Sequence, residues 1–372
     1  MKRALIICLA AVISVCACER VTTLPRPTIP LVMQIAADTA GLRAVAASAG
    51  HQGARGAIAL IGEPADGLLL SHRFQHVDWV DNISGDGRRD SLPDFAGEEF
   101  QVILDGQSAP YSHFFSDGIS PVEDGPEALR EIAVGNALFA WDSTCVEHNF
   151  SRPALLRKSR SKILIYTSPY QACFGLFDVD TLQQLTGGRS RLLSPLPVML
   201  QEAAAAGARN IAVWASRPLR LSGTVEYVAR ESAFSGQLTA LTPEAALDVR
   251  TQLRNLLRQY QTIGTSLDVL LLTDYDTDLA PLLSEIKLIR QSASEEDRAF
   301  SRMIAPGFRI LDPASSLIRA TYRLLREENL FTHRIALPAV TYYDTAESIS
   351  GETVLREVSP QYVQSAYVSD IY

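Results

Sequence analysis

The sequence predicts an α/β fold in which two domains are each built on a mainly parallel β-sheet. Short, continuously apolar segments such as 57–61, 162–166 and 268–272 alternate along the chain with segments of helical periodicity. Such runs are typical of strands that helices cover on both faces, which is the arrangement of parallel sheets. A chain of 372 residues is long enough for two domains that each have a core.

The expected elements follow one another in strand–helix order from residue 57 onward. Gly207 predicts the end of one helix, and Pro243 is typical of the first turn of another. Residues 31–56 are Ala-rich and predict a helical patch, whereas the polar, Gly- and Asp-rich stretch 66–97 predicts a long loop. We expect strands at 57–61, 100–104, 162–166, 210–214, 237–241, 268–272, 308–311 and 339–343. We expect helices at 126–141, 176–185, 197–206, 223–232, 243–261, 279–290 and 313–328.

The first twenty residues, MKRALIICLAAVISVCACER, have the pattern of an export signal. Lys2 and Arg3 precede an uncharged apolar run, residues 4–15, which is too short to span a bilayer comfortably. Ala17 before Cys18 resembles a lipobox, in which the Cys becomes the acylated first residue of the mature protein. We therefore expect a bacterial lipoprotein anchored at Cys18; the alternative is an ordinary cleaved signal peptide.

The expected lipoprotein has a signal peptide at 1–17 and a lipid anchor and tether at 18–53. Three prolines within 22–30 favour a stiff tether. The residue after Cys18 is Glu19 rather than Asp. By resemblance to lipoprotein sorting rules, the absence of Asp at this position favours the outer membrane, facing the periplasm. No other apolar run approaches eighteen residues, so fatty acyl chains such as palmitate on Cys18 are the expected membrane attachment.

Charge and cysteine content exclude some classes of partner. The formal net charge is −8, which gives no basic surface for nucleic acid. Three of the five cysteines lie in the signal region, and Cys145 and Cys173 remain. We expect no disulfide between them, because they flank the 162–166 strand at opposite ends and their Cα atoms must approach within about 7 Å. Only a folded-back loop over 147–160 would bring them together.

Polar residues gather where the predicted strands end. Ligands in parallel α/β folds bind at the carboxyl ends of the strands, which makes these residues the first candidates for a site. The polar side chains at these ends, and just beyond them, are Glu63, Ser168, Tyr170, Ser216, Thr273, Asp274, Asp276 and Asp312.

Five segments, in their order and spacing, resemble the aspartate/glutamate racemase superfamily, and glutamate racemase in particular. The segments are 162–170, 210–223, 268–276, 305–312 and 341–345. The resemblance spans about 57–343 and implies two pseudo-symmetric α/β domains with a ligand cleft between them. It implies a first domain of residues 54–190 plus 313–372 and a second domain of residues 191–312. It also places the turn carrying Ser222 at the cleft, although Ser222 equally fits a helix N-cap.

The chain departs from this resemblance where the chemistry lies. The family needs two thiols, one on each face of the substrate Cα, to remove and return a proton. Ser168 and Asp274 stand where the two Cys are expected, and Asp276 stands where a His is expected. A Ser without an adjacent base is a poor proton acceptor, and Cys173 lies too far along the chain to replace the thiol. We therefore expect no standard two-thiol racemisation.

Other constellations have weaker chemical readings. His72 and His76 share a helical spacing with Asp78 nearby, and 82–93 echoes a calcium loop but has Pro93 where a bidentate Glu belongs. Surface and loop roles fit these residues better, so no metal and no cofactor is expected. Arg88, Arg89 and His72 are more simply surface residues than carboxylate ligands. Cys145 near His148 lacks a third orienting group for nucleophilic catalysis.

Three functions remain open at this point. The first is an envelope lipoprotein that binds a small carboxylate or an amino-acid-like ligand at Ser168, Ser216, Thr273 and Asp274. The second is an enzyme with altered proton-transfer or lyase chemistry, in which Asp274 or Asp276 is the base. The third is a structural envelope protein whose cleft is vestigial.

Overall fold

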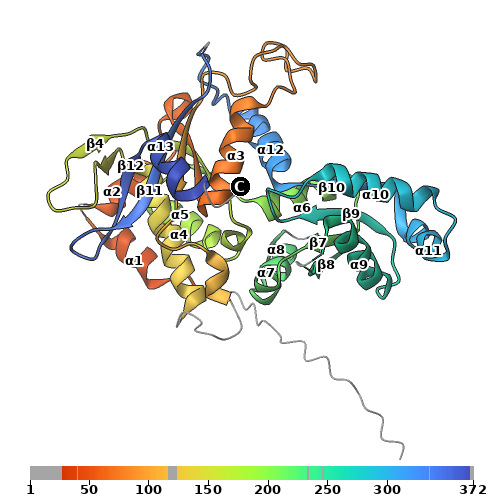
Figure 1. Ribbon diagram of the computed structural model, residues 1–372. Coiled ribbons are helices and arrows are strands. Elements are labelled where there is room, and N and C mark those ends of the chain that lie inside the picture. Colours follow the sequence, from red (N-terminus) through yellow and green to blue (C-terminus); the bar gives the residue numbers. More distant parts are fainter. Residues whose placement is uncertain are drawn as a thin grey trace, which may run out of the picture.

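The computed structural model describes residues 27–39, 41–115, 124–232, 234–244, 247–334 and 336–368. These residues form two α/β units that lie side by side, each with its own sheet (Figure 1). The predicted signal peptide and Cys18 lie outside the described residues. Within the described ranges, every helix is too short or too polar to cross a membrane.

The larger unit contains an eight-stranded sheet with the order β4-β3-β12-β11-β2-β1-β5-β6. Its pairs are parallel except β3 with β4 and β11 with β12, so the predicted parallel character is confirmed. The strands are β1 (Ala57–Gly62), β2 (Glu99–Leu104), β3 (Thr144–Val146), β4 (Leu155–Arg157), β5 (Ser161–Tyr166), β6 (Arg191–Leu193), β11 (Ala339–Glu347) and β12 (Thr353–Val358). The sequence analysis missed β3, β4, β6 and β12, which are short or polar and lie toward the edges of the sheet.

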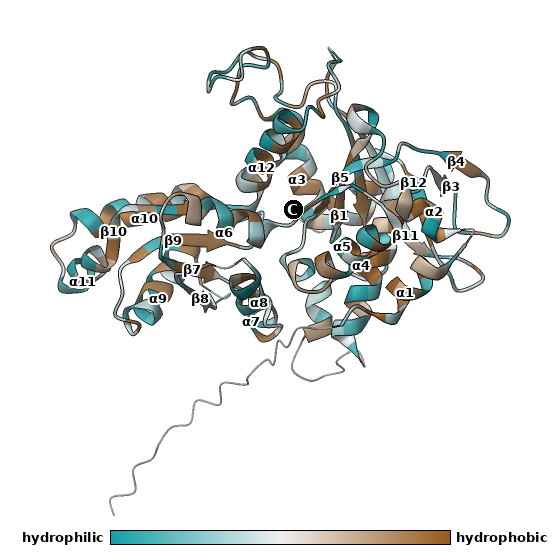
Figure 2. Ribbon diagram, turned by 180° about the vertical axis from the view of Figure 1, so that it is seen from behind, coloured by the Kyte–Doolittle hydropathy of each residue, from teal (hydrophilic) through white to brown (hydrophobic). Residues whose placement is uncertain are grey.

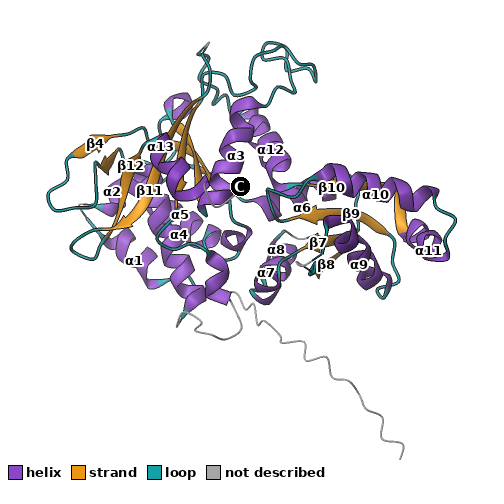
Figure 3. Ribbon diagram, viewed as in Figure 1, coloured by secondary structure: helices purple, strands orange, loops and turns teal. Residues whose placement is uncertain are grey.

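Helices cover both faces of this sheet, as Figure 3 shows. Successive side chains of a strand point to opposite faces, so Ala59 and Ile61 enter one core while Ile58 and Leu60 enter the other. The first core lies under α1 (Pro30–Ala37), α2 (Leu42–Ala47), α4 (Gly125–Trp141) and α5 (Leu176–Thr186). The second lies under α3 (Pro64–His76), α12 (Pro313–Glu327) and α13 (Pro360–Val363).

The smaller unit contains an all-parallel sheet with the order β10-β9-β7-β8. Its strands are β7 (Asn210–Trp214), β8 (Gln237–Leu241), β9 (Leu267–Leu272) and β10 (Ile304–Leu311). One core contains side chains of α6 (Pro195–Ala205), α7 (Arg217–Leu221) and α8 (Thr224–Glu231). The other contains side chains of α9 (Val249–Gln261), α10 (Leu279–Gln291) and α11 (Glu295–Met303). The apolar strands lie between the helix layers of each unit (Figure 2).

The predicted tether at 18–53 is wrong from residue 27 onward. Val32 and Ile35 of α1 are buried in the first core of the larger unit. Arg130 on α4 donates to Asp178 on α5 at 2.7 and 2.8 Å and to the carbonyl of Pro27 at 2.7 Å. The apolar face of α1 is buried against the larger unit. The Arg130 bond to Pro27 fixes the chain just before the helix. Residues 27–47 therefore belong to the larger unit.

Three boundaries also differ from expectation. The loop predicted at 66–97 begins only after α3, because Leu70 and Phe74 form a buried helical stripe behind Pro64 in the first turn. The helix predicted from Pro243 begins at Val249, where the carboxylate of Asp248 accepts from two main-chain amides. Residues 191–193 pair with β5 as β6, so the larger sheet extends past the predicted boundary at 190.

Cys145 and Cys173 are both buried, and the structure does not join them to each other by a disulfide. Cys145 lies in β3 and packs in the core beneath α4. Cys173 follows the 3-10 helix Pro169–Ala172 and packs with the core of the smaller unit. The separation arises because the two residues belong to different cores, rather than because they flank one strand.

Candidate functional site

The carboxyl end of β1 places Glu63 beside the end of β5. Gly62 adopts a φ of 154°, and a Cβ there would lie 2.2 Å from the hydroxyl oxygen of Thr167, so the two strand ends meet only with glycine. Glu63 Oε1 accepts a 2.9 Å hydrogen bond from the amide of Tyr111. Burial raises the pKa of Glu63 above its ordinary value, against the opposing effects of Tyr111 and Ser168. Glu63 is thus a partly buried carboxyl group at the strand end.

Ser168 is the least satisfied polar residue at this edge. Its side chain is fully buried, and its hydroxyl has no hydrogen-bond partner at bonding distance among the described residues. It nevertheless lies close enough to Glu63 to favour the ionised form of that carboxyl. A buried hydroxyl without a partner costs free energy, about 1–3 kcal/mol, that a bound ligand group can recover.

Asp105 follows β2 at the same edge and was missed by the sequence analysis. Its carboxylate accepts from the hydroxyls of Tyr111 at 2.7 Å and Thr345 at 2.8 Å, and from the amide of Asn136 at 2.9 Å. This carboxylate is therefore occupied in holding Tyr111, and through it the loop that contacts Glu63. Its place directly after the predicted strand 100–104 was a signal that could have found it; its partners, up to 240 residues away, were not predictable.

The carboxyl end of β9 supplies Thr273, Asp274 and Asp276. The hydroxyl of Thr273 donates to the carbonyl of Trp214 at 2.8 Å, so it joins β9 to β7. The side chain of Asp274 is exposed, but the surrounding protein still excludes part of the water that would otherwise hydrate its carboxylate. This loss of solvation raises the pKa of Asp274, and the charge of Asp276 raises it further.

The two strand-end sets meet through α3 and the segment after β5. Asp66, in the first turn of α3, has a pKa raised well above its ordinary value by burial and then by Glu63, Asp274 and Asp276. Carboxyl groups from both units therefore act on one position. We call Glu63, Asp66, Asp274 and Asp276 the acidic cluster. Asp66 was missed because the sequence analysis placed it in a loop.

Tyr170 and Ser216 lie beside the acidic cluster. Tyr170 stacks on Phe115 with ring centroids 5.0 Å apart, and burial raises the pKa of its hydroxyl. A hydrogen bond from Ser216 opposes that rise, whereas Glu63, Asp274 and Asp66 add to it. Ser216 also caps α7, since its hydroxyl accepts from the amide of Leu219 at 3.3 Å. The structure thus brings Tyr170 and Ser216 together with the cluster.

Ser222 has a different environment. Its hydroxyl donates to the carbonyl of Leu219 at 2.6 Å and accepts from the amide of Thr224 at 3.2 Å. These bonds shape the turn between α7 and α8. The N-cap role that the sequence left open is wrong, because Gly223 is the N-cap of α8 and Ser222 ends α7; its hydroxyl is occupied within the turn.

The weaker constellations have local partners of their own. His72 and His76 stack with centroids 4.4 Å apart, and Asp78 accepts from the amides of Asp90 and Ser91. Within the echo of a calcium loop, Asp90 accepts from the amides of Asn82 and Leu92. Among the described residues, His, Cys, Asp and Glu form no group of three arranged to hold a metal ion.

Cys145 is not placed for nucleophilic chemistry. Burial raises the pKa of its thiol, and the neighbouring charge of Glu357 raises it further. A raised pKa keeps a thiol protonated and unreactive. The ring of His148 packs instead against the ring of Phe150, with the two ring centroids 5.5 Å apart.

Comparison with known proteins gives a likeness of fold at low sequence identity. No protein-family model matches the sequence, and no curated protein matches it significantly. The structure is similar to glutamate racemase isoform RacE1 from Bacillus anthracis, with 14% identity and a TM-score of 0.48 over 80% of this chain and 90% of that one. Glutamate racemase from Francisella tularensis subsp. tularensis SCHU S4, solved with D-glutamate, has 12% identity and a TM-score of 0.48 over 80% of this chain and 91% of that one. PH1733, an aspartate racemase homologue from Pyrococcus horikoshii OT3, has 11% identity and a TM-score of 0.41 over 73% of this chain and 99% of that one. This likeness to aspartate and glutamate racemases assigns no ligand and no chemistry to the present chain.

Proposed function

We propose that this chain is an envelope lipoprotein that binds a small amino-acid-like ligand at the acidic cluster, without two-thiol racemisation. The observation that carries the proposal is the junction of the two units, where Tyr275 beyond β9 donates a 2.7 Å hydrogen bond to the carbonyl of Thr167 beyond β5. Beside Tyr275, burial and then the charges of Glu63, Asp274 and Asp276 raise the pKa of Asp66. Ser168 and Asp274 occupy the strand ends where two thiols would be needed.

The charge of the cluster favours a ligand with an ammonium group. Carboxylates crowded in a poorly hydrated site repel one another, and a bound cation relieves this repulsion. A purely anionic ligand would add to it. Of the two expected ligand classes, small carboxylates and amino-acid-like compounds, the amino-acid-like compounds therefore fit the acidic cluster better.

Neutral donors at the edge of the cluster provide for the other end of such a ligand. The buried hydroxyl of Ser168 has no partner at bonding distance. The hydroxyl of Tyr170, whose ring packs in a core of the smaller unit, lies beside that of Ser216. A ligand that accepts from Ser168 would recover the free energy that its unpaired hydroxyl costs.

Thermal unfolding of the soluble domain with four matched compounds tests the proposal. L-Glutamate and D-glutamate carry the ammonium group, N-acetylglutamate lacks the charge, and glutarate lacks the nitrogen. We expect saturable stabilisation by at least one glutamate enantiomer and none by the other two compounds. Stabilisation that glutarate matches would refute ammonium recognition. No stabilisation by any of the four would favour the structural, vestigial-cleft alternative.

An Asp66→Asn variant locates the binding, with Asp180→Asn as the control. Asp180 lies on the exposed face of α5, where its side chain accepts from Gln184. Ligand stabilisation should be lost in the first variant and kept in the second. Equal stabilisation of both variants would place the ligand away from the acidic cluster.

A second candidate function is proton transfer with Asp274 as the base. Its raised pKa makes it a stronger base than an ordinary carboxylate. Incubation with D- and L-glutamate and aspartate in D₂O would place deuterium at the substrate Cα if this chemistry occurs. Incorporation that disappears in Asp274→Asn would replace the noncatalytic proposal with this one.

The lipid anchor and the location of the protein in the cell form a separate part of the proposal. Metabolic labelling of the full chain with a palmitate analogue should label the wild type and not Cys18→Ser. Fractionation of the labelled cells should place the protein in the outer membrane. An unlabelled wild type that is still processed would indicate an ordinary signal peptide.

A further inference from the structure

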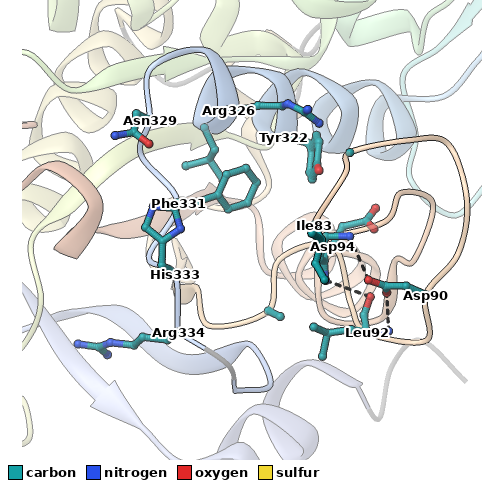
Figure 4. A pocket seen from close by; sticks show the side chains of 14 residues that line it. Ile83, Asp90, Leu92, Asp94, Tyr322, Arg326, Asn329, Phe331, His333 and Arg334 are labelled. Carbon is teal, nitrogen blue, oxygen red and sulfur yellow. Dashed lines mark hydrogen bonds between the residues drawn. The ribbon is translucent and has the colours of Figure 1, made fainter.

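A pocket of about 510 Å³ lies between the 77–98 loop and the end of α12 (Figure 4). A volume of this size is in the range of small-molecule sites. Its floor contains Tyr322 and Phe331, whose ring centroids are 5.2 Å apart in an edge-to-face arrangement. Leu92 and Leu325 extend the apolar lining. None of the lining residues belongs to the acidic cluster.

The carboxylates of the pocket are already engaged by main-chain amides. Asp94 accepts from the amides of Trp79 and Val80 at 3.1 Å, and it is 4% exposed. The Asp90 bonds to the amides of the same loop were described above. These two side chains therefore hold the loop that forms one wall; Asp94 is buried there, whereas Asp90 is exposed.

Arg326 ties the loop to α12. Its guanidinium donates to the carbonyl of Ser84 at 3.0 Å. Gly85 has a φ of 72°, which favours glycine, and Arg326 Nη1 lies 1.3 Å from where a Cβ would stand, so a side chain there would displace the guanidinium. The same guanidinium also lies within hydrogen-bonding reach of the Tyr322 hydroxyl. A guanidinium has five N–H donors, so these two partners do not use all of them.

The basic side chains of the pocket lack carboxylate partners within the described part of the chain. Among the residues that the structure describes, no ion pair includes Arg326, His333 or Arg334. His333 and Arg334 are exposed, and Figure 4 shows His333 beside Phe331 on the wall opposite Asp90 and Leu92. His333 also has a φ of 54°, an uncommon conformation for a residue other than glycine, and such residues gather at ligand sites.

We propose that this pocket binds a small amphipathic anion, such as an aromatic or branched aliphatic carboxylate. The apolar body of the ligand packs on Tyr322 and Phe331. Its carboxylate meets Arg326, the main donor, and the basic side chains of His333 and Arg334. This site is separate from the acidic cluster and does not depend on the function proposed there.

Calorimetric titration with three matched probes tests the charge preference. Phenylbutyrate, phenylbutanol and phenylbutylamine share one apolar body and differ in the charge of the end group. We expect saturable binding of phenylbutyrate, about tenfold weaker binding of the alcohol and weaker binding still of the amine, since a charge-assisted hydrogen bond distinguishes them. Equal affinities, or no saturable binding of phenylbutyrate, would overturn the proposal.

Variants on α12 test the location. Arg326→Gln should weaken phenylbutyrate binding about tenfold, and Arg326→Lys should restore part of the loss because the charge returns. Arg323→Gln, three residues earlier on an exposed face of the same helix, should bind as the wild type does. A second variant, His333→Gln, should weaken binding without disturbing the Arg326 bond to the loop. If Arg326→Gln and His333→Gln bind as tightly as the wild type, the ligand lies elsewhere.

The acidic cluster supplies the remaining control. Asp66→Asn should leave phenylbutyrate binding unchanged, because Asp66 does not line this pocket. Loss of phenylbutyrate binding in Asp66→Asn would assign the probe to the cluster and overturn the second site. Failure of glutamate to bind at the cluster would leave the phenylbutyrate result unaffected.

Discussion

The hydroxyl of Tyr275, just beyond β9, donates a 2.7 Å hydrogen bond to the carbonyl of Thr167, just beyond β5. Tyr275 is 4% exposed and Thr167 is fully buried. This bond joins the carboxyl ends of the two sheets directly beside the acidic cluster. The position of one strand end relative to the other thus depends in part on the hydroxyl of Tyr275.

Tyr275→Phe should loosen this junction while leaving each unit folded. Loss of one buried hydrogen bond should lower the free energy of unfolding by about 1 kcal/mol. Hydrogen exchange should increase at 167–172 and 273–278, which flank the bond. In Tyr260→Phe, which removes a hydroxyl bonded to Thr265 within the smaller unit, exchange at 167–172 should stay at the wild-type rate. Unchanged exchange in Tyr275→Phe would mean that apolar packing alone holds the units together.

The acidic cluster should make stability fall as the pH rises. The raised pKa values of Glu63, Asp66 and Asp274 mean that the folded protein binds protons more tightly than the unfolded chain does. Their contribution is therefore complete below the ordinary carboxyl pKa of about 4 and is lost as the pH rises through the folded values.

Asp66→Asn should consequently raise the Tm of the ligand-free protein at neutral pH by a few degrees, since about 1 kcal/mol shifts Tm by roughly 2–4 °C in a protein of this size. The gain should vanish near pH 4. Asp180→Asn should show neither effect. A lower Tm of Asp66→Asn at neutral pH would contradict the electrostatic account.

The buried ion pair of Lys162 and Glu98 should be needed as a pair. Lys162 Nζ lies 2.6 Å from Glu98 Oε2 and also donates to the carbonyls of Ala54 and Leu330. Lys162→Met would leave Glu98 buried without its partner, at a cost of about 3–5 kcal/mol in urea unfolding. The double variant Lys162→Met/Glu98→Gln should recover part of this loss. If the double variant is no more stable than Lys162→Met, the loss of stability does not come from an unpaired charge on Glu98.

Lys158 should destabilise the folded protein at neutral pH. Burial lowers the pKa of Lys158 to about 8. Its ammonium makes long hydrogen bonds, to Gln101 Oε1 at 3.3 Å and to the carbonyls of Ala140 and Ser159 at 3.4 Å, and lies 5.7 Å from the centre of the Tyr343 ring. Because the unfolded chain keeps the proton up to about pH 10.4, this group makes stability rise with pH between about 8 and about 10.

Lys158→Met should therefore stabilise the protein at neutral pH by about 1–3 kcal/mol and remove that rise. Chemical denaturation across this pH range measures both effects. Lys287→Met, on the exposed face of α10, should leave the pH profile as it is in the wild type. A destabilised Lys158→Met would mean that the ammonium contacts outweigh the cost of burial.

Much of the architecture could be predicted from periodicity. The apolar runs that became β1, β5, β7 and β9 are covered on both faces, and such burial leaves a continuous pattern that no other arrangement explains as well. The edge strand β4 left no comparable pattern, because Leu155 and Arg157 are exposed and pair on one side only. Helix α1 was mistaken for tether because its cover comes from α5, more than a hundred residues away.

For the candidate site, the sequence by itself determined which polar residues follow the strands, because parallel strands end at one edge of their sheet. Glu63, Ser168 and Asp274 were identified in this way. Only the tertiary structure decided that Asp66 joins them, that Ser222 is occupied in a turn and that Asp105 is used up by distant partners. The place of Asp66 depends on how the two units meet, and the partners of Asp105 come from up to 240 residues away, so the local sequence records neither. The partners of Ser222 are local, but only the geometry of the turn selects them.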